Sequence, residues 1–330
     1  GESTQFKIFG MLLFGFGVLV ALFPFHTWAP RGYEAAPTSV SMLHAGVLKK
    51  FGLYGLVQIA APLLPEAALA WSPYLLWLAL GNVLFVGFVT LAQTNLKSMV
   101  GNGSVMHMGY CFLGVGVCSS LGAGATVMLM AAHGLSVSLM FLLSQYVYRR
   151  SGTLEMTQMG GLASQTPVLA CFFIAASLAT IGLPGFGNFW GEFGIFLSLG
   201  ENSNHQLILG LAALGIIISA IFGLRAVARI FYGKQSDELS EYAKDSPIVD
   251  LSVTEMIPAG VLVSALLFLG LWPKGISERV NHEIHLRYES SSSLSGRTSQ
   301  LPPCCLAGKD QEGKESVSPE DSTTLEPKKD

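Results

Sequence analysis

The sequence predicts an all-α, polytopic transmembrane helix bundle, and its composition and charge distribution carry this prediction. Of 330 residues, 51% are hydrophobic and only 12% are charged, whereas about 25% of the residues in a soluble domain are charged. Positions 277–330 hold 17 of the 41 charged residues, which leaves 24 for the first 276 positions. A stretch that is so long and so apolar is typical of a protein that crosses a membrane several times.

Apolar segments of sufficient length occur about eight times along the chain. A helix needs about 20 apolar residues to cross about 30 Å of hydrocarbon. The expected spans cover 6–25, 37–62, 73–93, 105–120, 123–148, 167–200, 206–232 and 253–272. In the sixth span Pro184 lies among glycines in the sequence IGLPGFGN, so we expect a broken helix there. Phe23-Pro24 is a milder break signal in the first span, and broken membrane helices often mark an ion site.

Basic residues fall in alternate connecting loops, which predicts the orientation of the bundle. These residues are Lys97, Arg149, Arg150, Arg225, Arg229, Lys234 and Lys244. By the positive-inside rule, we expect the loops that hold them to face the cytoplasm. Lys7 falls on the opposite side and does not fit this pattern.

The segment 277–330 differs in composition from the rest of the chain. It is rich in Ser, Pro, Glu and Lys, so we expect a disordered tail with no assigned function. Cys304 and Cys305 are interpreted as two exposed thiols of that tail. None of the five cysteines has the spacing of a zinc or iron–sulfur site, and no metal site is expected.

Ionisable residues inside the apolar runs are the main functional signal, because their burial in hydrocarbon costs several kcal/mol. Lys49 and Lys50 lie in the second run, His107 and His133 lie in the fourth and fifth, and Glu192 follows the break in the sixth. Adjacent residues on a helix point about 100° apart. We therefore expect one lysine to face the interior and the other to snorkel or pair.

Each of these residues also has a structural interpretation. A buried lysine can be purely structural, Glu192 can be the partner in an interhelical salt bridge, and a histidine can hydrogen-bond across helices. Three kinds of titratable group on separate helices, beside a broken helix, together favour a proton relay. The sequence has no phosphate-binding loop, nucleophile elbow or His–Cys metal pattern.

Four stretches of sequence carry a resemblance to a known family. They are FPFHTWAPRGYEAAPTSVSMLHAGVLKKFGLYGL, AQTNLKSMVGNGSVMHMGY, AAHGLSVSLMFLLSQYVYRRSGT and ASLATIGLPGFGNFWGEFGIFLSLG. In this order they resemble the antiporter-like membrane subunits of respiratory complex I, of the type called subunit M or subunit 4. The resemblance extends from about Gln5 to Trp272 and does not include the tail.

The resemblance implies a domain organisation, since such subunits contain two inverted five-helix repeats. Within a transmembrane proton-translocating domain at 1–276, it places the end of the first repeat at 1–62. A complete second repeat would occupy 73–232, and a final helix 253–272. Most of the first repeat would then be missing from the chain, which we expect to be a piece of a longer polypeptide.

The resemblance also implies roles for five residues. Lys50 matches the lysine of the family motif that ends in LLK, and His107 matches the histidine of SVSHMG. His133 matches the AHGL motif, and Glu192 matches the glutamate of VGEF. These four residues would form the proton relay, and Lys97 would mark proton uptake from the cytoplasmic side.

The function implied by the resemblance is that of a non-redox translocase subunit of an NADH–quinone oxidoreductase. The chain would move protons while electron transfer takes place in partner subunits, both membrane and peripheral. It would itself hold no flavin, iron–sulfur cluster or quinone, and it would bind no nucleic acid. The expected location is an energy-transducing membrane, such as the inner membrane of a bacterium.

Two departures from the family pattern leave other functions open. The family usually has a lysine seven residues before the histidine that corresponds to His26, where this chain has Leu19, and Arg31 replaces an aspartate in the next loop. The alternatives are a subunit of a cation/proton antiporter, which could carry Na⁺, a subunit of a membrane-bound hydrogenase, or a non-conducting scaffold. Lipid-facing or sealed positions for Lys50 and Glu192 would indicate the scaffold.

Overall fold

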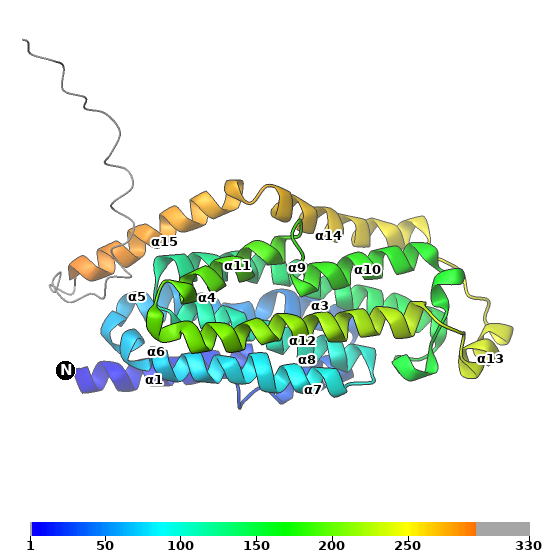
Figure 1. Cartoon of the computed structure of the whole chain (residues 1–330), viewed down its shortest axis with the longest axis horizontal. Helices are drawn as coiled ribbons and strands as arrows, with labels where there is room; N and C mark the ends of the chain where they lie inside the picture. The colour runs from blue at the N-terminus through cyan, green and yellow to red at the C-terminus, as the bar shows by residue number, and fades with distance from the viewer. Residues whose placement is uncertain (1, 295–330) are drawn as a thin grey trace, which may run out of the picture.

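The computed structural model describes residues 2–294, and nearly all of them are helical (Figure 1). Within that range there is no strand, only an isolated bridge between Asn95 and Glu155. The helices, in chain order, are α1 (Glu2–Val20), α2 (Trp28–Ala35), α3 (Thr38–Leu43), α4 (Lys50–Gly55), α5 (Ala61–Leu63), α6 (Pro65–Leu80), α7 (Gly87–Ala92), α8 (Leu96–Gly116), α9 (Ser120–Ser151), α10 (Pro167–Ile181), α11 (Gly187–Gly200), α12 (Gln206–Phe231), α13 (Asp237–Asp245), α14 (Val253–Leu271) and α15 (Lys274–Leu294). The predicted all-α class is confirmed.

Short π-helical segments join some of these helices into longer spans. Segments η1 (His44–Leu48) and η2 (Leu56–Ala60) connect α3, α4 and α5, and η3 (Gly81–Val86) connects α6 and α7. Single turns of 3₁₀-helix occupy Met156–Gln158, Leu162–Ser164 and Ser203–His205. A π-helical turn disturbs the regular ladder of backbone hydrogen bonds, and such turns are frequent at functional sites.

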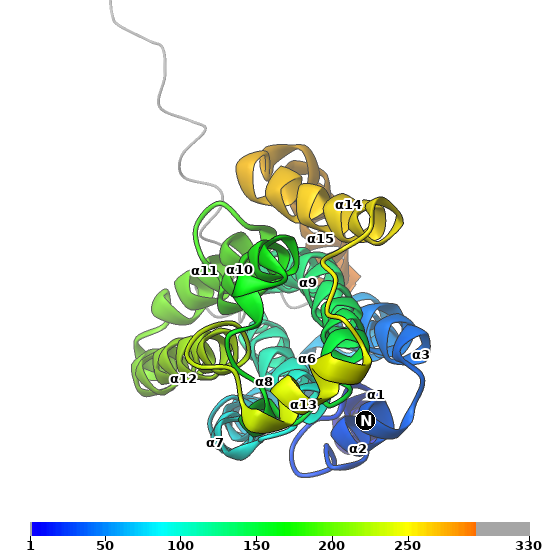
Figure 2. The ribbon, with the colours of Figure 1, turned by 90° about the vertical axis from the view of Figure 1, so that its right-hand side faces the viewer.

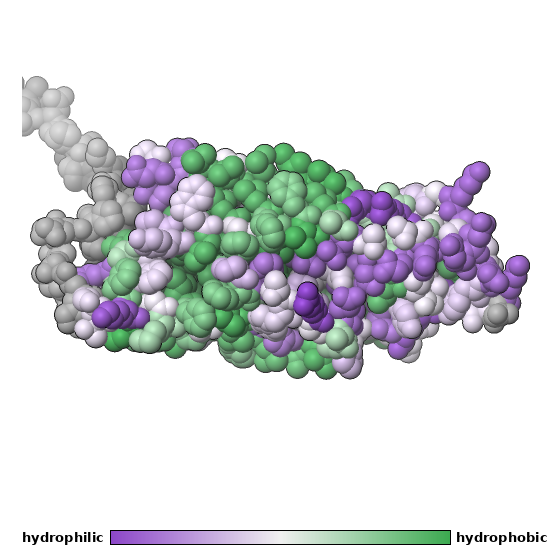
Figure 3. All heavy atoms as spheres, turned by 90° about the horizontal axis from the view of Figure 1, so that it is seen from below, coloured by the Kyte–Doolittle hydropathy of each residue, from purple (hydrophilic) through white to green (hydrophobic). Residues whose placement is uncertain are grey.

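Helices long and apolar enough to cross a membrane occur five times within residues 2–294. They are Ser3–Val20, Pro65–Ala92, Ser120–Ser151, Ser203–Phe231 and Val253–Leu271. The other predicted runs are also helical, but they are interrupted or more polar. Hydrophobic side chains cover the middle of the face shown in Figure 3, and hydrophilic ones gather toward the end that holds α13. The chain is therefore an integral membrane protein.

Helix α8 is the centre of the bundle, because all 21 of its residues are buried. It contacts α2, α6, α7, α9, α11 and α12, whose arrangement is seen end-on in Figure 2. A Cβ atom at Gly109 would lie 2.9 Å from the Ala79 carbonyl oxygen, so close packing requires glycine there. The predicted fourth run began at 105, whereas α8 begins at Leu96, because its polar first turns lie inside the bundle.

The predicted break at Phe23-Pro24 is confirmed, since α1 ends at Val20. Asn82 satisfies the backbone groups that this break leaves free. Its side chain donates a hydrogen bond to the Ala21 carbonyl at 3.0 Å and accepts one from the Phe23 amide at 2.5 Å. One buried amide thus makes a non-helical backbone tolerable at membrane depth.

The predicted break near Pro184 is also confirmed, because α10 ends at Ile181 and α11 begins at Gly187. Gly182 ends α10 in a left-handed conformation with φ of +84°, which favours glycine. The chain then re-enters the bundle as α11, and Glu192 lies on its buried face.

The tail prediction is wrong for 277–294, because these residues belong to helix α15. Ile284 is buried, and Ile276 and Val280 are half-buried, so one apolar stripe at helical spacing packs on α9. The stripe is narrow, and the polar composition of the segment therefore predicted disorder instead of a helix. Positions 295–330, which include both cysteines of the predicted tail, lie outside the described residues.

The basic loops gather at one end of the bundle. The Leu96 amide donates to the Leu154 carbonyl at 2.8 Å, and the Gly161 amide donates to the Tyr232 carbonyl at 3.2 Å. These bonds bring together the connections that follow α7, α9 and α12, on the side where Figure 1 shows α13. The loops therefore share one side of the membrane, and their cytoplasmic location stays a prediction.

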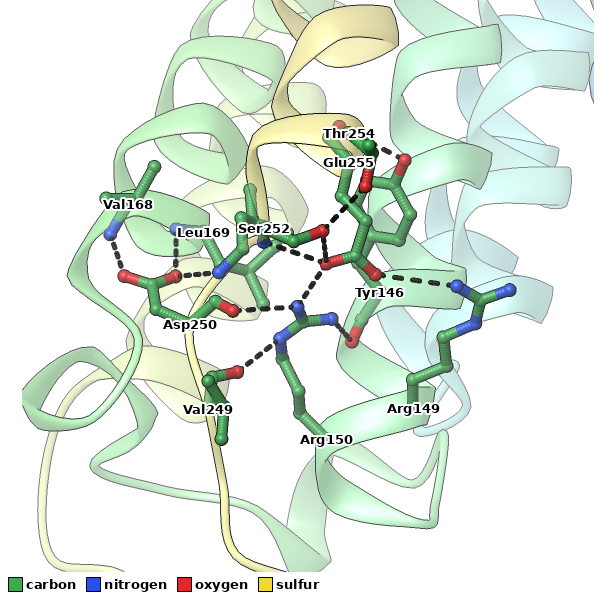
Figure 4. Close-up of polar contacts among 11 residues, drawn as sticks. Tyr146, Arg149, Arg150, Val168, Leu169, Val249, Asp250, Ser252, Thr254 and Glu255 are labelled. Atoms are coloured by element: carbon green, nitrogen blue, oxygen red, sulfur yellow. Dashed lines mark hydrogen bonds and ion pairs between the residues drawn. The ribbon is translucent and has the colours of Figure 1, made fainter.

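A buried arginine anchors α14 to α9 at that end (Figure 4). Arg150 donates to the Glu255 carboxylate at 2.7 Å and to the Val249 carbonyl at 2.9 Å. The Asp250 carboxylate accepts hydrogen bonds from two backbone amides in the first turn of α10, at 2.7 and 3.1 Å. The connection before α14 thus joins the end of α9 to the start of α10.

We expect Arg150→Leu to lower the free energy of unfolding by about 2–3 kcal/mol, because it removes the short ion pair of a largely buried carboxylate and the hydrogen bonds to the Val249 and Asp250 carbonyls. Arg149→Leu is the matched control, since Arg149 is 58% exposed and lies 3.4 Å from the same carboxylate. Its loss should cost at most about 1 kcal/mol. Thermal unfolding in lipid nanodiscs measures both, and equal effects would contradict the anchoring role of Arg150.

Candidate functional site

Lys50, which is buried, begins α4 with one residue between it and the end of the π-helical segment η1. Its amine donates a hydrogen bond to the Ala45 carbonyl and lies 3.3 Å from Nδ1 of His133. Two glycines allow this approach, because a Cβ atom at Gly134 would lie 2.7 Å from the Gly46 carbonyl oxygen. The close contact between η1 and α9 therefore sets the pairing of Lys50 with His133.

His107 on α8 faces Glu192 on α11, and both side chains are buried. Nδ1 of His107 lies 3.3 Å from Oε1 of Glu192, which is within ion-pair distance. The two groups are not aligned as a hydrogen bond, and Nε2 of His107 has no hydrogen-bond partner. Both residues of this pair therefore have donor or acceptor atoms in the centre of the bundle that make no hydrogen bond.

The two histidine rings connect these pairs. The ring centroids of His107 and His133 are 5.8 Å apart, with an interplanar angle of 51°. The four side chains thus form a line in the order Lys50, His133, His107 and Glu192, and each comes from a different helix.

The break between α10 and α11 positions the carboxylate at the end of this line. A Cβ atom added at Gly182 would overlap the carboxylate of Glu192. Nearby, the buried Asn188 amide donates to the Ser136 hydroxyl at 3.1 Å, while its own Oδ1 has no hydrogen-bond partner. The broken segment therefore surrounds Glu192 with small and polar groups rather than with lipid.

Lys97 does not join this cluster. It lies ten positions before His107 on α8, about 15 Å along the helix axis. Its amine donates hydrogen bonds to the carbonyl groups of Glu34, at 3.2 Å, and Ala36. Lys97 thus binds the last carbonyl groups of α2, where the basic loops gather.

Lys49 is a buried residue whose placement the sequence reasoning missed. We expected one lysine to face the interior and the other to snorkel or pair, but the exposed fraction is 0% for Lys49 and 6% for Lys50. The Lys49 amine donates to the Ser104 hydroxyl at 2.7 Å and lies 5.5 Å from the centroid of the Tyr33 ring. Nothing in the sequence near Ser104 signalled this contact.

A cavity of about 20 Å³ lies between α8, α9, α10 and α12, on the side of His107 that faces Lys97. Its polar lining residues are Ser104, His133, Ser177 and Thr180. The hydroxyl of Ser177 is buried without a hydrogen-bond partner. By volume, the cavity can hold about one water molecule.

The arrangement is suited to proton transfer. Amine, imidazole and carboxylate groups can each accept and release a proton, and a line of them allows short hops. Within residues 2–294, no group of three or more His, Cys, Asp or Glu side chains could hold a metal ion.

These features define a polytopic membrane helix bundle with a buried line of titratable side chains. The chain belongs to the NADH:quinone oxidoreductase/Mrp antiporter transmembrane family, whose profile matches residues 1–223.

Individual relatives agree with this assignment. The chain is 32% identical over 309 residues to NAD(P)H-quinone oxidoreductase chain 4 2 of Synechococcus sp., covering 91% of this chain and 57% of the relative. It is 35% identical over 266 residues to NADH-quinone oxidoreductase subunit M of Rickettsia bellii, covering 80% and 52%. The chain thus spans a little more than half the length of these relatives.

The fold also matches a solved structure. A chain of respiratory complex I from Thermus thermophilus with bound NADH superposes with a TM-score of 0.79 at 30% identity. The match covers 89% of this chain and 60% of that one. The predicted resemblance to antiporter-like complex I subunits is confirmed.

We expect Gly182→Ala to displace the Glu192 carboxylate and to lengthen its 3.3 Å separation from His107. Gly185→Ala is the matched control, because Gly185 also has a positive φ, of +105°, but a Cβ atom there meets open space. Both variants strain the backbone by about 1–2 kcal/mol, and only the first should move Glu192. High-resolution cryo-electron microscopy of the assembled variants would show this, and an unmoved carboxylate in Gly182→Ala would contradict it.

Proposed function

We propose that this chain is a proton-translocating membrane subunit of an NADH–quinone oxidoreductase. The observation that carries the proposal is the buried line of Lys50, His133, His107 and Glu192. Adjacent members are separated by 3.3 Å, by 5.8 Å between ring centroids, and by 3.3 Å. Protons would hop along this line, with one bridging water between the two imidazole rings.

The same proposal assigns proton uptake to the end of the bundle that holds Lys97. The cavity beside His133 lies between that end and the line, so a single water there would shorten the route. Glu192 would release the proton on the other side of the relay. It lies against Gly182, and the adjoining Leu183 is 43% exposed.

The coupling of proton movement to electron transfer, and the partner subunits, are inferred from the relatives, which are named as subunits of quinone oxidoreductases. Electron transfer would take place in partner subunits, and this chain would respond to it electrostatically and conformationally. The proposal places no flavin, iron–sulfur cluster or quinone in this chain. It keeps the predicted repeats at 1–62 and 73–232, the final helix, and a location in an energy-transducing membrane.

The scaffold alternative is disfavoured by the contacts within the line, which place the four side chains beside one another rather than against lipid or in purely apolar packing. The four side chains are at most 6% exposed, and each lies next to another titratable group. Leu19, by contrast, is 37% exposed on α1. Its replacement of a family lysine therefore leaves the line itself uninterrupted.

We expect Glu192→Gln and Lys50→Ala each to lower proton translocation by about tenfold or more, because each removes a proton-carrying group. Assembly should be retained. Glu201→Gln is the matched control for the carboxylate, since Glu201 is exposed at the end of α11 and lies outside the line. The measurement is the proton-to-electron ratio of the assembled complex, and a normal ratio in both relay variants would reject the proposal.

Purification in mild detergent, with mass spectrometry of the accompanying proteins, tests the complex itself. We expect flavin-containing and iron–sulfur subunits of an NADH dehydrogenase. Antiporter or hydrogenase subunits would instead support the other members of the superfamily.

A further inference from the structure

Lys49 is a second buried amine that the proposed line does not use. Its side chain points away from Lys50, toward α8 and α2, where it meets the Ser104 hydroxyl and the Tyr33 ring. Within residues 2–294, no carboxylate lies within ion-pair distance of either lysine amine. Hydrogen bonding to a hydroxyl and a cation–π contact are thus the only stabilisation described for an ammonium group there.

Two adjacent buried amines without a carboxylate are costly when both are permanently charged. The cost is smaller when a proton can leave one of them. A proton from Lys49 can pass to Ser104, because the Ser104 hydroxyl accepts its hydrogen bond and Ser104 also lines the cavity.

The cavity leads from Ser104 to the relay, since His133 lines it as well. Ser177 contributes a buried hydroxyl without a hydrogen-bond partner. A buried water needs two to four polar partners and a volume of about 10–15 Å³. The cavity of about 20 Å³ offers that volume; its walls are almost entirely apolar, and Ser104, His133, Ser177 and Thr180 are the polar residues that border it.

We propose that Lys49 is a further proton-exchanging residue, which trades protons with His133 through Ser104 and one water in this cavity. The inference rests on the relay of the proposed function. The Lys49 ammonium gives a proton to the Ser104 oxygen while the Ser104 hydroxyl proton passes to the water, and the water protonates a ring nitrogen of His133. One proton moves, Lys49 is left neutral, and the reverse steps restore it.

The first test is Lys49→Arg in the assembled complex. Arginine keeps the positive charge and the donor groups, but it does not release a proton in proteins. If Lys49 only supplies positive charge and hydrogen-bond donors, translocation should stay normal. If it exchanges protons, we expect a several-fold loss of translocation rate and a changed pH profile of the remaining rate.

The second test fills the cavity with Ser177→Val. The added methyl groups should exclude the water and lower the rate several-fold. Ser219→Val is the matched control, because Ser219 is an equally buried serine on α12 that hydrogen-bonds within its own helix and does not line the cavity. Its rate should be normal.

High-resolution cryo-electron microscopy of the unaltered complex decides the matter even where a variant fails to assemble. Water density in the cavity, beside Ser177, supports the inference, and an empty cavity overturns it. Normal rates in Lys49→Arg and Ser177→Val, together with a defective Glu192→Gln, would reject Lys49 exchange and leave the relay intact. A normal Glu192→Gln would reject the relay and this inference with it.

Discussion

The structure depends on one constraint: hydrocarbon offers no hydrogen bonds, so every polar group at membrane depth needs a partner inside the bundle. This explains why α8, which is not among the five most apolar long helices, is buried along its whole length. It also explains why Asn82 binds both free backbone groups of the first break. The two lysine amines obey the same rule, because Ser104 and the Ala45 carbonyl accept their hydrogen bonds. His107 and Glu192 depart from it, since they lie within ion-pair distance but keep atoms without a hydrogen-bond partner.

Irregular backbone and glycine supply the space and the acceptors for these residues. The Ala45 carbonyl, in the π-helical segment before Lys50, accepts a hydrogen bond from the lysine amine. The break at Gly182 similarly brings a residue without a side chain against the Glu192 carboxylate. Two of the local departures from helical geometry, the π-helical segment before Lys50 and the break at Gly182, thus lie beside ionisable groups, and in transporters broken helices often mark the ion site.

The positions of the helix breaks were predictable from the sequence. The contacts between side chains far apart in the sequence were not. Pro184 and Phe23-Pro24 predict both breaks, because proline and glycine change the backbone conformation at their own positions. The pairing of Lys50 with His133 joins residues 83 positions apart, and no periodicity specifies it. The helix α15 was missed for a different reason, since its few apolar residues are diluted by a polar composition that is typical of disorder.

The same constraint applies to the two positions, 19 and 49, at which a lysine is lost or gained relative to the family. This chain has Leu19 where its family usually has a lysine, but it carries Lys49 beside Lys50. The two positions are not equivalent, because Leu19 is 37% exposed on α1, whereas Lys49 is fully buried against α8. An amine at position 49 reaches Ser104, which lines the cavity, instead of the flank of α1. The second amine therefore lies on the side of the proposed relay that faces Lys97, where a mobile proton would meet His133 first.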